Sequence, residues 1–233
     1  MDPSKVKDGD VLLSSTGKRQ LAFKLTAKPA DFQKLSVRKV LCSPLRRALL
    51  TALATYPDHR IIVDPRLREV NARKGMTIRR LKAWLKKAQP DRADDVDFSR
   101  LSAGLWWGSE EADDAEGRLQ SFLKDVSRAC ARTRAVALVS HSVAFQTMGG
   151  LQGRPFPKLW GTRRGWPKNF KPYFANVRPS AGKLRLVAVA PRSARLVLVR
   201  HAHSAKQAAR TAKKKLLKMK AVEALRRCRF RRL

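Results

Sequence analysis

Short apolar runs alternate along this chain with segments that carry a helical pattern, and this alternation constrains the fold more than any other feature. The predicted strands are residues 37–42, 61–63, 135–140, 184–189 and 196–200. The predicted helices are residues 16–25, 45–54, 77–88, 115–132 and 143–149. Strands that alternate with helices favour a parallel sheet covered by helices on both faces. We therefore expect an α/β fold, a three-layer sandwich with a mostly parallel sheet.

Charged and polar residues follow several of these predicted strands. Arg47, Glu69 and His141 come soon after the first three strands, and Arg200 and His201 end the last one. Folds of this class place ligands at the carboxyl ends of their strands. Paired arginines bind phosphoryl oxygens with two hydrogen bonds each. A neutral imidazole can attack phosphorus while a carboxylic acid protonates the leaving oxygen. These residue types therefore predict a phosphate pocket.

The same segments resemble the histidine phosphatase (phosphoglycerate mutase-like) superfamily. Residues 43–52 (SPLRRALLTA) match the family's Ser-Pro-Leu-x-Arg-Ala-x-x-Thr-Ala helix at every fixed position. The other similar segments are 15–22 (STGKRQLA) for a helix start, 67–69 (LRE) for the acid, 140–142 (SHS) for the second histidine and 174–177 (FANV) for a late segment. The resemblance implies that His201 is the nucleophile, that Arg200, Arg47 and His141 bind phosphate, and that Glu69 donates a proton.

The order of the segments differs from the family's order. The Arg-His strand comes first in the family, but here it comes last, at Arg200 and His201. The chain therefore resembles a circular permutation in which the first strand, residues 195–201, is appended after the others. Ala202 and Ser142 also stand where the family has glycine. These departures leave open whether the pocket is active or belongs to a scaffold recruited for another role.

The charge of the chain indicates a polyanionic partner. There are 52 Lys and Arg residues against 18 Asp and Glu residues, a formal net charge of +34. Such an excess repels itself and weakens the compact state, whereas a phosphate backbone relieves it by counterion release. Between Asp125 and Glu223 the chain has no carboxylate side chain at all. We expect RNA as the partner, with an anionic membrane surface as the rival.

Two basic segments are the candidate RNA contacts. The first, residues 154–178, is interrupted by Gly and Pro and is predicted to be a loop in which cations alternate with aromatic rings. The second, residues 204–233, lacks Gly and Pro and is predicted to be a basic C-terminal helix that extends an α/β domain of residues 1–203. The candidate RNA-binding residues are Arg154, Lys158, Trp160, Arg163, Arg164, Trp166, Lys168, Lys171, Lys206, Arg210, Lys213, Lys214, Lys215, Lys218, Lys220, Arg226, Arg227, Arg229, Arg231 and Arg232.

Several classes of protein are disfavoured. The three cysteines lie far apart without a CxxC pair, which predicts neither a disulfide framework nor a zinc site. We expect no metal and no cofactor. The longest apolar runs are too short to cross a bilayer, and the first residues resemble neither a signal peptide nor an obvious transit peptide.

The charge and the motifs lead to two competing functions. The first expectation is a structural, rRNA-binding component of a ribonucleoprotein, namely a mitochondrial or otherwise divergent ribosome, with neighbouring proteins as further partners. The alternative is an active histidine phosphatase that forms a phospho-His201 intermediate. In either case a phosphate or nucleotide is expected in the pocket of His201 and His141. A basic protein of the membrane surface is the third hypothesis.

Overall fold

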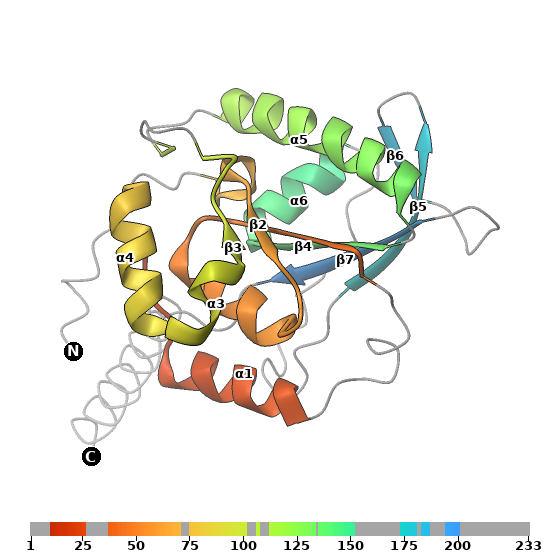
Figure 1. Cartoon of the computed structure of the whole chain (residues 1–233). Coiled ribbons are helices and arrows are strands. Elements are labelled where there is room, and N and C mark those ends of the chain that lie inside the picture. The colour runs from red at the N-terminus through yellow and green to blue at the C-terminus, as the bar shows by residue number, and fades with distance from the viewer. Residues whose placement is uncertain are drawn as a thin grey trace, which may run out of the picture.

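The computed structural model of the chain describes residues 10–26, 37–70, 75–101, 106–107, 112–133, 135–151, 173–180, 183–186 and 194–200. One seven-stranded sheet forms the middle layer, in the order β3-β2-β1-β4-β7-β5-β6. Helices α1, α3 and α4 lie on one face of the sheet, and α5 and α6 lie on the other (Figure 1). The fold is therefore the three-layer α/β sandwich that the sequence predicts.

The first five strands of the sheet order are parallel. They are β3 (Val96–Asp97), β2 (Ile61–Val63), β1 (Lys39–Cys42), β4 (Ala135–Ser140) and β7 (Ala194–Arg200). The last two are β5 (Tyr173–Ser180) and β6 (Lys183–Leu186), which lie at one edge of the sheet. Strand β5 pairs antiparallel with both of its neighbours, β7 and β6. Strand β7 comes last in the chain but lies inside the sheet, between β4 and β5.

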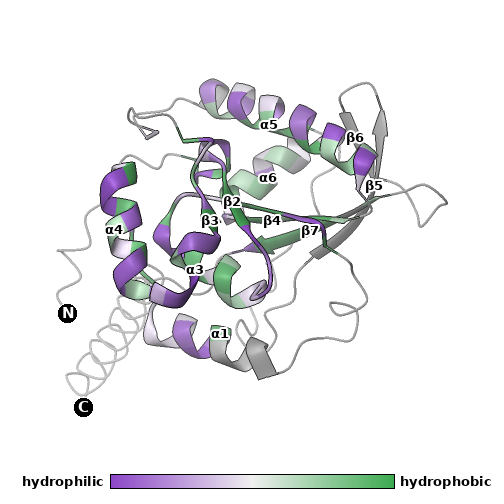
Figure 2. Cartoon of the chain, viewed as in Figure 1, coloured by the Kyte–Doolittle hydropathy of each residue, from purple (hydrophilic) through white to green (hydrophobic). Residues whose placement is uncertain are grey.

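The helices pack their apolar sides onto the sheet. They are α1 (Ser15–Thr26), α3 (Arg46–Thr55), α4 (Ile78–Ala88), α5 (Ala112–Arg132) and α6 (Ser142–Leu151), with short 3₁₀ turns η2 (Pro65–Leu67) and η3 (Pro90–Asp95). In α5, four buried residues, Leu119, Phe122, Leu123 and Val126, recur at helical spacing on one side. Figure 2 shows the hydrophilic sides of α4 and α5 turned away from the sheet.

Two hydrophobic cores, one on each face of the sheet, hold the layers together. Val40 and Cys42 of β1 pack in the core beneath α1, α3 and α4, whereas Leu41 packs in the core beneath α5 and α6. Residues 196–199 of β7 alternate between the two cores in the same way. Successive side chains of a strand point to opposite faces, so a continuous apolar run is required where both faces are covered.

Most predicted elements are confirmed, with ends that move by a few residues. One prediction is partly wrong: Tyr173–Arg178, expected in the basic loop, belongs to β5, which continues through Pro179 to Ser180. Cations and a proline obscured the strand pattern there, and backbone pairing with β7 and β6 outweighs that local signal. The two-residue β3 was not predicted either, because it is too short to show a period.

Several predictions fall on residues outside the described ranges. These are the loop at 154–171, the tail at 204–233 and His201 itself. The division into a domain of residues 1–203 and a C-terminal extension stays a prediction. In the part of the chain that the structure describes, no helix is long and apolar enough to span a membrane.

Candidate active site

The parallel strands bring the predicted pocket residues to one edge of the sheet. Strands β1, β4 and β7 are neighbours, and residues of the site lie at or just beyond their carboxyl ends. Ser140 of β4 is paired with Arg200 of β7, and His141 lies one residue beyond that pair. Arg47 lies in the first turn of α3, which follows β1. The topology therefore juxtaposes segments that are far apart in the sequence.

His141 is fully buried and is held by a serine of the neighbouring strand end. Its Nε2 lies 2.8 Å from the Oγ of Ser43, which is also fully buried. The Ser43 hydroxyl accepts a hydrogen bond from the backbone N–H of Leu45, at 3.3 Å. Because one lone pair of that oxygen is used in this way, the hydroxyl can direct its proton to the imidazole. Ser43 thus fixes the orientation of the His141 ring.

Glu69 follows η2, and its carboxylate reaches the start of α6. Its Oε1 accepts hydrogen bonds from the backbone N–H groups of Val70, at 3.2 Å, and Ala144, at 3.1 Å. Burial raises the pKa of Glu69, and this effect outweighs the opposing effects of the Ala144 N–H and of the Arg47 charge. A carboxyl group with a raised pKa keeps its proton to higher pH, as a general acid requires.

Two guanidinium groups share the neighbourhood of this carboxyl. Burial lowers the pKa of Arg47, against the opposing charges of Glu69 and Asp10. Burial also lowers the pKa of Arg200, to about 10, against the opposing charge of Glu69. Arginine side chains are not deprotonated in proteins near neutral pH, so both groups carry a positive charge. A buried cation is costly unless an anion compensates it, so this pair favours a bound anion such as a phosphoryl group.

The loop that carries Glu69 is anchored by a buried aspartate. Asp64 Oδ1 accepts the backbone N–H of Arg66 at 3.0 Å and so caps η2. Its carboxylate also pairs with the guanidinium of Arg66 at 2.8 Å and with that of Arg100 at 2.9 Å. Burial would raise the pKa of Asp64, but the hydrogen bonds from the two arginines lower it. Asp64 is therefore a carboxylate at neutral pH and fixes the path of the loop.

Two further contacts hold the loop from outside it. The Oγ of Ser140 donates to the carbonyl oxygen of Leu67 at 2.7 Å, within the core. Arg118 of α5 donates to the carbonyl oxygens of Arg66 and Arg68. Ser140 directly precedes His141, so this hydrogen bond ties the histidine and the acid to each other.

A second aspartate holds the segment before α1 against the start of α3. Asp10 Oδ1 accepts the backbone N–H of Arg46 at 2.7 Å, and its Oδ2 pairs with the Arg46 guanidinium at 3.1 Å. Burial raises the pKa of Asp10, although the charges of Arg46 and Arg47 oppose this. The charge of Asp10 thereby also acts on Arg47.

The structure brings four of the five predicted pocket residues to this edge: Arg47, Glu69, His141 and Arg200. His201 follows Arg200 directly but lies outside the described residues, as do all the candidate RNA-binding residues. Sequence reasoning missed the supporting residues Ser43, Ser140, Asp64 and Asp10. Ser43 and Ser140 could have been noticed, because each is the first residue of a segment that resembles a family motif. Among the described residues, no group of three or more His, Cys, Asp or Glu could hold a metal ion.

Comparison with known proteins agrees with this geometry. Residues 5–165, more than half of the chain, match the family model described as histidine phosphatase superfamily (branch 1). The matched span includes Arg47, Glu69 and His141. A search of curated proteins found no match. With the motifs, the strand-end geometry and the family model in agreement, the chain belongs to the histidine phosphatase superfamily.

Proposed function

We propose that this protein hydrolyses a phosphate monoester through a phosphohistidine intermediate on His201. The observation that carries the proposal is that the charges of Arg47 and Arg200 both act on one carboxyl, Glu69, near the strand ends that also hold His141. Superfamily membership supports a phosphoryl-transfer reaction. Phosphoryl transfer depends mainly on positioning and on stabilisation of charge, which paired guanidiniums supply.

The proposed reaction has two balanced steps. In the first, an imidazole nitrogen of His201 forms a bond to phosphorus while the bond from phosphorus to the ester oxygen breaks. Glu69 gives its proton to the departing oxygen, which leaves as an alcohol. In the second step, water attacks phosphorus and the N–P bond breaks. Glu69 takes a proton from that water, and inorganic phosphate leaves.

The surroundings of Glu69 suit both steps. Its raised pKa favours the protonated form that the first step needs. The backbone N–H groups of Val70 and Ala144 favour the carboxylate that remains after proton transfer. Arg47, Arg200 and His141 would hold the phosphoryl oxygens, and Ser43 would keep the His141 ring in place.

Hydrolysis assays test the proposal. The full chain is expected to release phosphate from p-nitrophenyl phosphate, and His201→Ala is expected to abolish the release. His203→Ala is the matched control, because it removes an imidazole two residues away in the chain and should keep the activity. Absence of turnover by the folded full chain, or equal activity of the two variants, would count against the proposal.

We infer that the chain is a circular permutation of the family's order. The inference is supported by two features: the Arg-His motif stands at the end of β7, and β7 lies parallel to β4 inside the sheet although it comes last in the chain. Permutation costs little when the original ends of a domain lie close together. The nucleophile strand can then occupy an interior position whatever its place in the sequence.

A second candidate function is favoured by the charge. The net charge of +34 and the absence of carboxylate side chains from Val126 to Val222 support binding to RNA within a ribonucleoprotein, such as a mitochondrial or divergent ribosome. The test is sedimentation of a tagged endogenous protein at low salt. Co-migration with ribosomal particles is expected, and a protein that runs free of them would exclude this function.

A further inference from the structure

Helix α4 presents an exposed face that consists mainly of cations. Its apolar side is occupied, because Leu81 and Leu85 are buried in the core and Trp84 packs against it beneath the guanidinium of Arg46. Five exposed cations cover the outer side: Arg79, Arg80, Lys82, Lys86 and Lys87. Among the described residues, none of these five pairs with a carboxylate. At 3.6 residues per turn they span an arc of about 160° and a length of about 12 Å.

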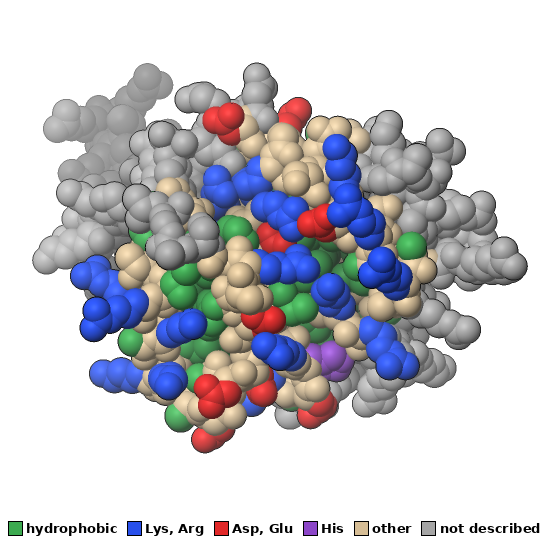
Figure 3. Space-filling view, turned by 45° about the horizontal axis from the view of Figure 1, so that its top comes forward, with side chains coloured by type: hydrophobic (Ala, Val, Ile, Leu, Met, Phe, Trp, Pro, Cys, Tyr) green, Lys and Arg blue, Asp and Glu red, His purple; other side chains and the backbone are tan. Residues whose placement is uncertain are grey.

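We propose that this face of α4 is a docking surface for the phosphate backbone of single-stranded RNA. The inference goes beyond the phosphatase proposal and rests on the second candidate function, since it assumes that the whole chain binds RNA. It adds a contact within the α/β domain itself, in a region to which the sequence assigned no RNA contact. Figure 3 shows Lys and Arg side chains spread over one face of the molecule, with fewer carboxylates among them.

The occupied apolar side of α4 argues against a membrane as the partner. A helix that binds a bilayer surface buries its apolar face among the acyl chains. Here Leu81 and Leu85 are fully buried in the protein, so α4 has no apolar face to insert. A protein partner is also a poor match, because interface cores are depleted in Lys and enriched in aromatic residues. Phosphate contacts need only exposed cations.

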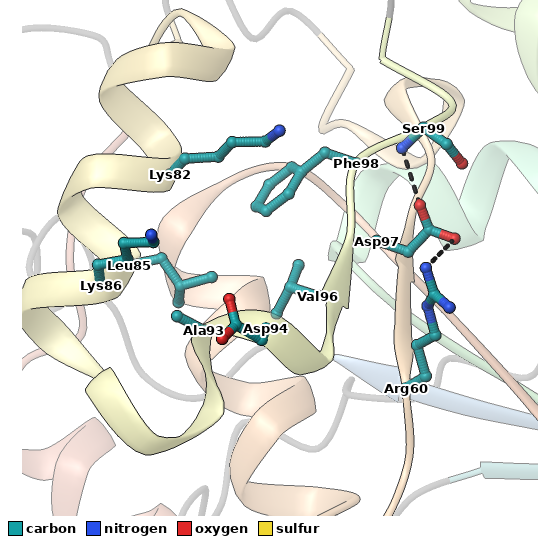
Figure 4. A pocket seen from close by; sticks show the side chains of 10 residues that line it. All are labelled: Arg60, Lys82, Leu85, Lys86, Ala93, Asp94, Val96, Asp97, Phe98 and Ser99. Carbon is teal, nitrogen blue, oxygen red and sulfur yellow. Dashed lines mark hydrogen bonds and ion pairs between the residues drawn. The ribbon is translucent and has the colours of Figure 1, made fainter.

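A cavity of about 490 Å³ lies beside this face, between α4 and the segment from β3 to Ser99 (Figure 4). Lys82 and Lys86 line it, and the ammonium group of Lys82 lies 5.7 Å from the centre of the Phe98 ring. Its volume is within the roughly 300–1,000 Å³ that is usual for ligand pockets. The two lysines therefore belong both to the cationic face and to the cavity.

The carboxylates of the cavity determine which part of a nucleotide it would accept. Asp94 and Asp97 also line it, and Asp97 is already paired with Arg60 at 3.4 Å and with the backbone N–H of Ser99 at 2.9 Å. The lining also holds the cations Arg60, Lys82 and Lys86, but a phosphate that entered the cavity would meet both carboxylates. Phosphates would contact the outer cations of α4, while an unstacked base enters the cavity, as single-stranded RNA allows.

This surface is separate from the candidate active site. Strand β3 is the edge strand on the α4 side, and three strand spacings separate it from β4, which His141 directly follows. At about 4.8 Å per spacing, that distance is about 14 Å across the sheet. Arg79, Lys82 and Lys86 are also exposed and are not pocket residues, so substitutions at these positions should leave the phosphatase site intact.

The test compares two triple variants of the full chain. Arg79→Gln/Lys82→Gln/Lys86→Gln removes three cations from α4. Lys18→Gln/Arg19→Gln/Lys124→Gln is the matched control, because it removes the same charge from exposed positions on α1 and α5. Gln is a good helix former, so both variants should fold. Folding is checked by circular dichroism. Affinity for a fluorescent single-stranded RNA is measured by anisotropy between about 50 and 200 mM KCl.

The proposal predicts that only the α4 variant changes the salt dependence. Loss of three phosphate contacts should reduce the slope of log K against log [KCl] by about 2, at about 0.7 for each contact. Equal changes in the two triple variants would overturn the proposal, because net charge alone would then explain binding. An α4 variant that keeps its RNA affinity but loses binding to anionic vesicles would also overturn it, in favour of a membrane. Failure of the unaltered chain to bind RNA would instead exclude the second candidate function.

Photo-cross-linking tests the cavity. RNA that contains 4-thiouridine is expected to cross-link within residues 79–99, and the α4 triple variant should lose these cross-links. Cross-links confined to other parts of the chain would contradict a base in this cavity.

Discussion

The hydroxyl of Ser140 donates a hydrogen bond of 2.7 Å to the carbonyl oxygen of Leu67. Ser140 precedes His141, and Leu67 lies two residues before Glu69. The bond therefore joins the strand end that presents the histidine to the loop that presents the acid. Both partners are fully buried, so neither can exchange the bond for one to water.

Removal of this hydroxyl should affect both stability and activity. Ser140→Ala leaves the Leu67 carbonyl unsatisfied in the core, which costs about 1–3 kcal/mol of the free energy of unfolding. Because the Glu69 loop loses an anchor, kcat should fall while KM changes little. Urea denaturation and steady-state kinetics measure these effects. Ser15→Ala, which removes an exposed hydroxyl at the first residue of α1, is the control and should change stability by less than about 0.5 kcal/mol.

The role of Glu69 as a proton donor predicts a dependence on the leaving group. Glu69→Gln should reduce kcat/KM, which reports the phosphorylation step alone, by about 10²–10⁴-fold with an alkyl phosphate, whose leaving oxygen needs a proton. With p-nitrophenyl phosphate the loss should be much smaller, because p-nitrophenolate leaves without protonation. Parallel assays with the two substrates measure the difference. Equal losses with both would show that Glu69 does not act as a general acid.

The raised pKa of Glu69 also predicts a pH dependence of stability. The folded state binds the proton more tightly than the unfolded state, whose pKa lies near 4.5. Stability from this group is therefore fully present below that value and is lost as the pH rises through the folded pKa. Glu69→Gln should remove this decline, which urea titrations at a series of pH values would measure. A decline that persists in the variant would assign it to another group.

Arg47 should contribute to phosphate affinity through its fork of donors. Arg47→Lys keeps the charge but loses two-point binding, so inhibition by inorganic phosphate should weaken by about tenfold or more. Inhibition constants at pH 7 measure this change. Arg19→Lys, at an exposed position on α1, is the control. Unchanged inhibition in Arg47→Lys would place the phosphate elsewhere.

Asp64 should contribute stability with the opposite pH dependence. Asp64→Asn removes the carboxylate that Arg66 and Arg100 share, while Arg66 keeps its pair with Asp125, so the cost should be about 1–3 kcal/mol. The folded pKa of Asp64 is lowered from 3.8. Its contribution is therefore fully present above about that value and is lost as the pH falls through the folded pKa. The difference in unfolding free energy between the two proteins should be constant near neutral pH and shrink in acid.

The sequence predicted much of this molecule because several of its signals are strong and local. The apolar run of β4 and the helical spacing of α5 define elements whose ends hardly move, and motif residues locate Arg47, Glu69 and His141. The position of β7 inside the sheet depends on pairing between distant segments, which no local pattern encodes. The same is true of the bond between Ser140 and Leu67 and of the pairing of Arg66 with Asp125. Strand β5 escaped prediction because its pairing outweighs its loop-like composition.

The most direct test of the proposed activity is capture of the phosphorylated enzyme. The full chain is mixed with a phosphate monoester and quenched in alkali, where phosphohistidine survives, and its peptides are then examined by mass spectrometry. Glu69→Gln, which slows attack by water, should increase the captured amount when the substrate has a good leaving group. We expect one phosphoryl group on His201, absent from His201→Ala and present in His203→Ala. Turnover without any phosphohistidine, or a phosphoryl group on another residue, would contradict this expectation.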